Sequence, residues 1–139
     1  MKRIILLSFA AFASMAHAEP LQSEPVQLAP FDARVQLAIA AESDERFKTY
    51  RPAMLRRNGR YLARTMRSCI AASPKPEKKT VTLVADINAE GKATGIEVKP
   101  ENAVAGCYAS GFAAASYPKP PAYPGREGFP VTMKIRVVR

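Results

Sequence analysis

Side chains that could carry out catalysis are scarce in this chain. The sequence of 139 residues contains two cysteines, Cys69 and Cys107, and a single histidine, His17. Histidine triads, histidine general bases and histidine metal sites all need a histidine in the folded protein, and His17 lies in a segment that we expect to be removed. Two cysteines alone do not complete a zinc site, and the Asp and Glu residues form no recognisable catalytic pair. We therefore expect no enzymatic activity, no metal and no cofactor.

That segment, 1–18, has the three parts of a cleavable signal peptide. Lys2 and Arg3 precede the apolar run 4–16, and a small-x-small cleavage site ends at Ala18. The alternative is an uncleaved membrane anchor, but the apolar run is shorter than the roughly 20 residues that a spanning helix needs. We expect export to the periplasm, with secretion as the alternative, and no membrane span in the mature chain.

The two cysteines are candidates for a covalent bond. An even number of cysteines in an exported protein favours one disulfide, and two buried free thiols are the alternative. Helical periodicity over 53–72 predicts an apolar stripe made of Met54, Leu55, Asn58, Tyr61, Leu62, Thr65, Met66 and Cys69. A second helix from about 103 to 115, capped by Asn102, carries Cys107 on its own stripe. Two cysteines on inward-facing stripes can meet, so we predict a Cys69–Cys107 disulfide.

The rest of the pattern predicts strands. Alternating side chains indicate a hairpin of strands 80–88 and 93–99 about a turn in which Gly91 supplies a positive φ. The segment 129–138 alternates in the same way and is the predicted last strand. A returning helix between strands two and three makes the third strand antiparallel to the first, with sheet order 2-1-3. We predict an α+β fold, α-β-β-α-β, in which two helices pack on a three-stranded antiparallel sheet.

The N-terminal part of the mature chain divides into two further segments. Residues 19–30 contain three prolines and no periodicity, which predicts a flexible leader. Residues 31–52 form an extra helical segment in which Asp32 is the predicted N-cap. The main domain then covers 53–139, with its third strand at an edge of the sheet.

Positive charge is concentrated in one part of the chain. The whole sequence has 21 Lys and Arg against 12 Asp and Glu, and loss of Lys2 and Arg3 leaves a formal charge of +7. The helix over 53–72 carries five arginines away from its apolar stripe: Arg56, Arg57, Arg60, Arg64 and Arg67. Arginines bind phosphate and carboxylate groups, so lipopolysaccharide, acidic peptidoglycan groups or an acidic protein face are candidate partners. The alternative is a solvated helix face, and export makes nucleic acid an unexpected partner.

Several features, taken in order, resemble the C-terminal domain of TonB- and TolA-type energy transducers, particularly the cysteine-bridged TonB-like family. Cys69 lies late in the first helix, and 81–93 looks like the family's strand, Asp-x-x-Gly-Lys turn and strand. Cys107 lies early in the second helix, and Tyr-Pro-Lys-Pro-Pro at 117–121 precedes the final strand. The resemblance spans about 61–138 and is carried by order and spacing.

The resemblance implies that the last strand adds a partner's extended peptide to the edge of the sheet. The edge residues are then Val131, Met133, Lys134, Ile135, Arg136 and Val137. The alternative is an edge that positive side chains merely protect against aggregation. Transducers carry an uncleaved membrane helix and a long spacer, whereas this chain has about 30 residues between its signal and its basic helix. We expect capture of an envelope protein or peptide without energy transduction, or an accessory subunit docked through 19–50.

Overall fold

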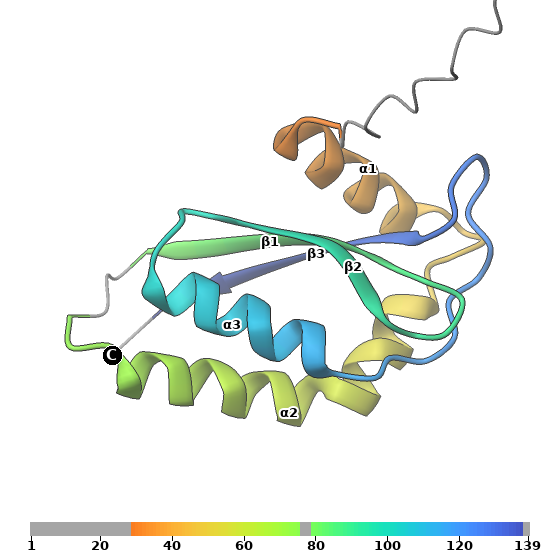
Figure 1. Cartoon of the computed structure of the whole chain (residues 1–139). Helices are drawn as coiled ribbons and strands as arrows, with labels where there is room; N and C mark the ends of the chain where they lie inside the picture. Colours follow the sequence, from red (N-terminus) through yellow and green to blue (C-terminus); the bar gives the residue numbers. More distant parts are fainter. Residues whose placement is uncertain (1–28, 76–78, 138–139) are drawn as a thin grey trace, which may run out of the picture.

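The computed structural model describes residues 29–75 and 79–137, and these ranges contain three helices and three strands (Figure 1). In chain order the elements are α1 (Phe31–Ser43), α2 (Tyr50–Ala72), β1 (Thr80–Ile87), β2 (Ala93–Lys99), α3 (Ala103–Ala114) and β3 (Phe129–Arg136). The predicted signal peptide and all but the last two residues of the predicted leader lie outside the described residues. None of the described helices is both long and apolar enough to cross a membrane.

The strands form one antiparallel sheet in the order β2-β1-β3, so the predicted α+β fold and strand order are confirmed. In the turn between β1 and β2, the side chain of Asn88 accepts hydrogen bonds from the backbone N–H groups of Glu90 and Lys92. Gly91 has φ 74°, and a Cβ atom there would lie 2.2 Å from the carbonyl oxygen of Tyr117. The turn therefore needs glycine both for its conformation and for its contact with the chain after α3.

The sheet is covered on both faces (Figure 1). α2 and α3 pack against one face, where the core contains Leu83 and Ile87 of β1. α1 lies against the other face, where Val84 of β1 and Thr132 of β3 are buried. Because successive residues of a strand point to opposite faces, the central part of β1 is buried on both sides.

The structure tests three predicted helix starts. Pro30 occupies the N-cap of α1 and no side chain caps this helix, so the prediction of Asp32 as N-cap is wrong. Asp32 lies in the first turn, where a carboxylate suits the positive end of the helix. α2 begins at Tyr50, just before the periodic segment 53–72, and Pro52 lies in its first turn as expected, where its missing N–H has no intrahelical role. The predicted cap of α3 is confirmed, since the side chain of Asn102 accepts a backbone hydrogen bond from the first turn.

α2 buries one side along steps of three and four residues. Its buried residues are Tyr50, Met54, Asn58, Leu62, Met66 and Cys69. Leu55 and Tyr61, which the periodicity placed on this stripe, flank it and are each 36% exposed. The predicted Cys69–Cys107 disulfide is present and joins α2 to α3, with 5.7 Å between the Cα atoms. The prediction that both cysteines face inwards is wrong for Cys107, which is exposed at the side of α3 that meets the end of α2. Its sequence separation of 38 residues corresponds to a stabilisation of about 3–4 kcal/mol in the chain-entropy model.

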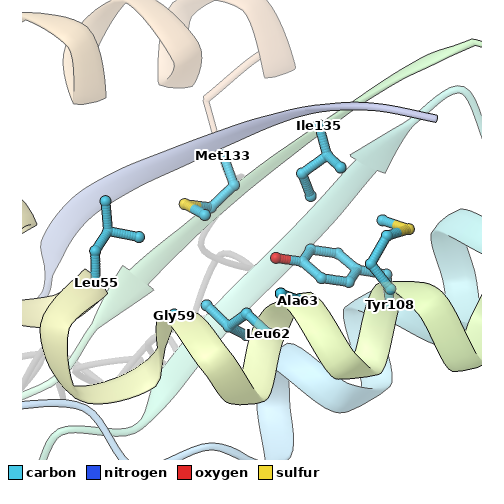
Figure 2. Close-up of a pocket in the computed structure, with 8 residues that line it drawn as sticks. Leu55, Gly59, Leu62, Ala63, Tyr108, Met133 and Ile135 are labelled. Atoms are coloured by element: carbon cyan, nitrogen blue, oxygen red, sulfur yellow. The ribbon is translucent and has the colours of Figure 1, made fainter. Parts of the chain in front are cut away.

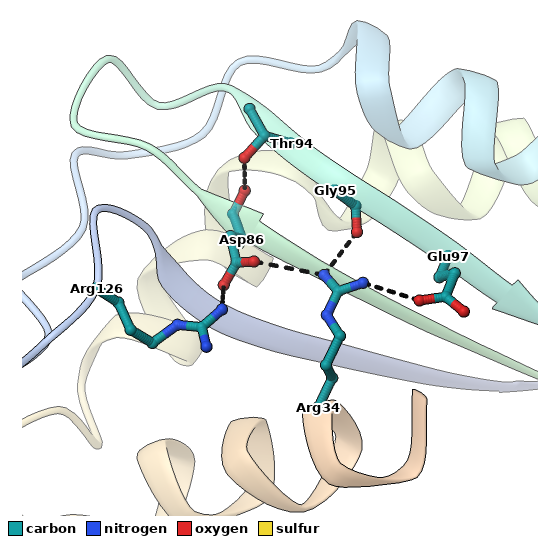
Figure 3. Close-up of polar contacts among 6 residues, drawn as sticks. All are labelled: Arg34, Asp86, Thr94, Gly95, Glu97 and Arg126. Atoms are coloured by element: carbon teal, nitrogen blue, oxygen red, sulfur yellow. Dashed lines mark hydrogen bonds and ion pairs between the residues drawn. The ribbon is translucent and has the colours of Figure 1, made fainter. Parts of the chain in front are cut away.

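α1 is held to the sheet by a buried arginine (Figure 3). Arg34 is 4% exposed, and its guanidinium donates to the carbonyl oxygen of Gly95 at 2.6 Å. It also contacts the carboxylates of Glu97 at 3.1 Å and Asp86 at 3.4 Å. Arg126, from the segment before β3, donates to the other oxygen of Asp86 at 2.7 Å. This network ties α1, β1, β2 and the chain leading into β3 together.

Candidate functional site

β3 is an edge strand whose backbone groups face two ways. Continuing its register with β1, Val137 lies opposite Lys79 and donates its N–H to the Lys79 carbonyl. In antiparallel strands every second pair of opposite residues exchanges backbone hydrogen bonds in this way. Odd-numbered residues of β3 therefore bond to β1. The even-numbered residues turn their backbone groups outwards: Pro130, Thr132, Lys134 and Arg136. A proline at the first of these positions agrees with this, because an outward-facing residue gives up no ladder hydrogen bond.

Part of this edge is already occupied. Arg51, from the first turn of α2, donates to the outward carbonyl oxygen of Thr132 at 2.8 Å and also pairs with Glu42. Among the described residues, nothing bonds to the outward backbone groups of Lys134 and Arg136. The open part of the edge is therefore the C-terminal half of β3.

An apolar groove of about 320 Å³ runs beside the open edge, between α2 and β3 (Figure 2). It is lined by Leu55, Gly59, Leu62, Ala63, Met66, Tyr108, Met133 and Ile135. Gly59 leaves space on the α2 side, because a Cβ atom there would have no neighbour within 4 Å. Met133 and Ile135 are odd-numbered residues of β3, so the groove lies on the face of the edge strand that is turned towards α2.

Tyr108 brings a polar group into this apolar groove. The residue is 1% exposed, and its hydroxyl has no hydrogen-bond partner among the described residues. Figure 2 shows the hydroxyl directed towards the middle of the groove. Burial raises the pKa of Tyr108 to about 12, so the hydroxyl remains protonated at neutral pH and can donate a hydrogen bond. The hydroxyl therefore offers the apolar groove one polar group that can donate to an acceptor on a bound molecule.

The five predicted arginines of α2 divide between two flanks of the helix. At 100° per residue, Arg56, Arg60 and Arg67 lie within about 60° of Ala63, which lines the groove. Arg60, Ala63, Arg64 and Arg67 also form a hollow of about 320 Å³ that adjoins the groove at Ala63. Arg60, Arg64 and Arg67 therefore lie at the hollow beside the groove, and Arg56 lies on the same flank of α2 as Ala63.

Arg57 belongs to the other flank. It lies one helical turn before Tyr61, whose hydroxyl donates to the carbonyl oxygen of Gly111 in α3 at 3.0 Å. None of the five α2 arginines forms an ion pair with a described residue. By contrast, Arg46 pairs with Asp44, and its side-chain and backbone hydrogen bonds lower the pKa of Asp44 to about 2. Uncompensated positive charge is thus concentrated on α2.

The six predicted edge residues separate into two groups. Four bond to β1 and direct their side chains to the α2 side of the sheet: Val131, Met133, Ile135 and Val137. Lys134 and Arg136 have outward backbone groups and exposed side chains. The predicted edge residues did not include the α2 side of the groove. Leu55, Leu62 and Met66 of that side belong to the predicted apolar stripe, but the sequence did not indicate that they face β3.

Comparisons with known proteins give no match, so the geometry of the β3 edge and the groove is what indicates a function. No family model matches the chain, and neither the curated proteins nor the solved structures contain a match. Within residues 29–75 and 79–137, no three His, Cys, Asp or Glu side chains are grouped as metal ligands would be. The features that stand out are the open edge of β3, the groove beside it and the arginines of α2.

Proposed function

We propose that this chain is a periplasmic TonB C-terminal-like module that captures an extended peptide of an envelope protein, without catalysis or energy transduction of its own. The order of elements from α2 to β3 agrees with the resemblance seen in the sequence. Export rests on the signal-like segment 1–18 and is supported by the Cys69–Cys107 disulfide, because disulfides persist in oxidising compartments.

The open half of the β3 edge beside an apolar groove is the observation that carries this proposal. The outward backbone groups of Lys134 and Arg136 can pair with an added strand, and main-chain pairing of this kind supplies affinity. Every second side chain of that strand points towards α2, into the space that Gly59 leaves. Such alternate pockets supply specificity.

Proline at position 134 tests the edge. Lys134→Pro removes an outward N–H and spares the hydrogen bonds to β1, whereas Lys134→Ala removes only the side-chain charge. Peptides selected from a random display library against the oxidised mature protein should bind Lys134→Pro about tenfold more weakly than Lys134→Ala, as expected for one or two lost hydrogen bonds. Equal binding of these peptides to the two variants would show that the edge is not the site.

Binding of an anionic envelope component through α2 is the second candidate function. The observation that favours it is the set of exposed α2 arginines without ion-pair partners among the described residues. Binding of lipopolysaccharide or peptidoglycan fragments should then fall steeply with salt, because long-range attraction is screened. The double variant Arg60→Glu/Arg64→Glu should abolish it, whereas salt-independent binding would contradict this candidate.

A further inference from the structure

The open edge of β3 has different chemistry on its two faces. On the α2 side, Met133 and Ile135 line the apolar groove. On the α1 side, Thr132 is buried, but the side chains of Lys134 and Arg136 are exposed. Neither of these two cations has an ion-pair or hydrogen-bond partner among the described residues. The edge therefore offers apolar contact on one side and unpaired positive charge on the other.

An added strand would meet both surfaces in alternation. Residues directly opposite each other on neighbouring strands point to the same face, with Cβ atoms about 4.5–5.5 Å apart. A residue opposite Lys134 or Arg136 therefore lies beside a positive charge, and the next residue along points into the groove. Opposite charges in such cross-strand pairs are stabilising, and like charges are destabilising.

We propose that the segment captured by β3 alternates acidic and apolar residues, with the acidic side chains beside Lys134 and Arg136 and the apolar side chains in the groove. This inference rests on the proposed edge capture and specifies the class of peptide that the edge selects. A basic segment is disfavoured by the same geometry. So is a second copy of this chain, because pairing of two β3 edges brings Lys134 and Arg136 of both copies together.

The surroundings of the groove agree with an acidic ligand. Arg60 and Arg67 line the hollow that adjoins the groove at Ala63 and add to the positive potential at its opening. The hydroxyl of Tyr108 points into the groove without a hydrogen-bond partner among the described residues, so it is free to donate to a bound segment. Charge and the unpaired hydroxyl thus point to the same place.

Labelled peptides of equal length test the pattern by fluorescence anisotropy with the oxidised mature protein. One alternates Val and Glu, one alternates Val and Thr, one alternates Val and Lys, and one has the Val and Glu residues in two separate blocks. At low salt the alternating Val/Glu peptide should bind about threefold to tenfold more tightly than Val/Thr, as expected for two cross-strand charge pairs. The Val/Lys and block peptides should bind more weakly than Val/Glu.

A charge reversal at the edge should exchange this preference. Lys134→Glu should weaken binding of the Val/Glu peptide and strengthen binding of the Val/Lys peptide. Arg57→Glu is the matched control, because it makes the same change of charge on the flank of α2 that faces α3. An equal effect of the two variants would show that overall charge, rather than pairing at the edge, sets the preference.

The outcomes separate this inference from the proposed function. If the Val/Thr peptide binds as tightly as Val/Glu and both fail with Lys134→Pro, the edge captures peptides but the acidic pattern is wrong. If no peptide binds, or if binding survives Lys134→Pro, edge capture is wrong as well.

Discussion

Proline should have different consequences at two neighbouring positions of β3, because the N–H groups of Lys134 and Ile135 face different ways. Ile135 lies opposite Val81 in a pair that exchanges backbone hydrogen bonds with β1. Ile135→Pro removes the N–H that bonds Val81 and leaves a buried carbonyl without its donor, since Val81 is 1% exposed. Lys134 turns its N–H away from the sheet, so Lys134→Pro breaks no hydrogen bond to β1.

The size of the difference follows from these contacts. A buried carbonyl that loses its partner costs about 1–3 kcal/mol, and loss of part of the half-buried Ile135 side chain adds about 1 kcal/mol. We expect Ile135→Pro to lower the free energy of unfolding by about 2–4 kcal/mol. Lys134→Pro should lower it by less than about 1 kcal/mol, because proline is accepted at a strand edge and Met133 before it is already extended.

Urea unfolding followed by far-UV circular dichroism gives the free energy of unfolding of each variant. Ile135→Ala is the control, because it shortens the side chain and keeps the N–H, so its difference from Ile135→Pro isolates the backbone contribution. The reasoning is refuted if Lys134→Pro destabilises the protein as much as Ile135→Pro does. The outward groups of β3 would then belong to the odd-numbered residues, and the open edge would be placed wrongly.

Three further predictions concern the packing around the sheet. Gly59→Ala should raise the free energy of unfolding by about 0.5–1 kcal/mol through helix propensity, because a Cβ atom at Gly59 meets nothing within 4 Å. Gly111→Ala should lower the free energy of unfolding by about 1–3 kcal/mol, because a Cβ atom at Gly111 would lie 2.3 Å from a side-chain carbon of α2. Thermal unfolding of the two variants checks this, and equal shifts in melting temperature would contradict it. Arg34→Met should cost about 2–3 kcal/mol because it leaves the Gly95 carbonyl and part of the Asp86 charge without a partner. Urea unfolding and protection of α1 from hydrogen exchange measure this loss, and Arg56→Met, an exposed arginine without an ion pair among the described residues, is the control. Burial raises the pKa of Tyr108 from 10.0 to about 12, so its contribution to stability is complete below pH 10 and is lost as the pH rises towards 12. Unfolding measured across this range should show a smaller alkaline loss for Tyr108→Phe, and an unchanged loss would mean that Tyr108 does not contribute to it.

The parts of the fold that depend on local pattern could be predicted from the sequence. Strand alternation is visible within each segment, and the three strands lie where the alternation indicates. Asn102 caps α3 through a contact only three residues away. The Cys69–Cys107 pairing could be predicted from the even cysteine count behind a signal-like segment and from Cys69 on the buried side of its helix, although Cys107 itself is exposed.

Features that depend on distant parts of the chain could not be predicted. Arg34 is buried because Asp86, Gly95 and Glu97, more than 50 residues away, receive its guanidinium. No periodicity within α1 indicates this, since an arginine in a helix is expected to be solvated. In the sequence, Gly59 indicates only a weakened helix, whereas in the structure it leaves room beside β3. That room becomes apparent only when the position of the last strand relative to α2 is known.

The division of β3 into odd and even residues also connects two interpretations of its positive charges. Lys134 and Arg136 protect the edge against pairing with a second copy, because like charges would then face each other. The same charges do not oppose an acidic segment, so protection and capture are compatible on one edge. Because the odd-numbered residues hold β3 to β1 and line the groove, substitutions at 134 and 136 can change partner selection while the ladder of the sheet remains intact. In the proposed capture, the even-numbered side chains select the partner, and the odd-numbered residues hold the edge strand to β1.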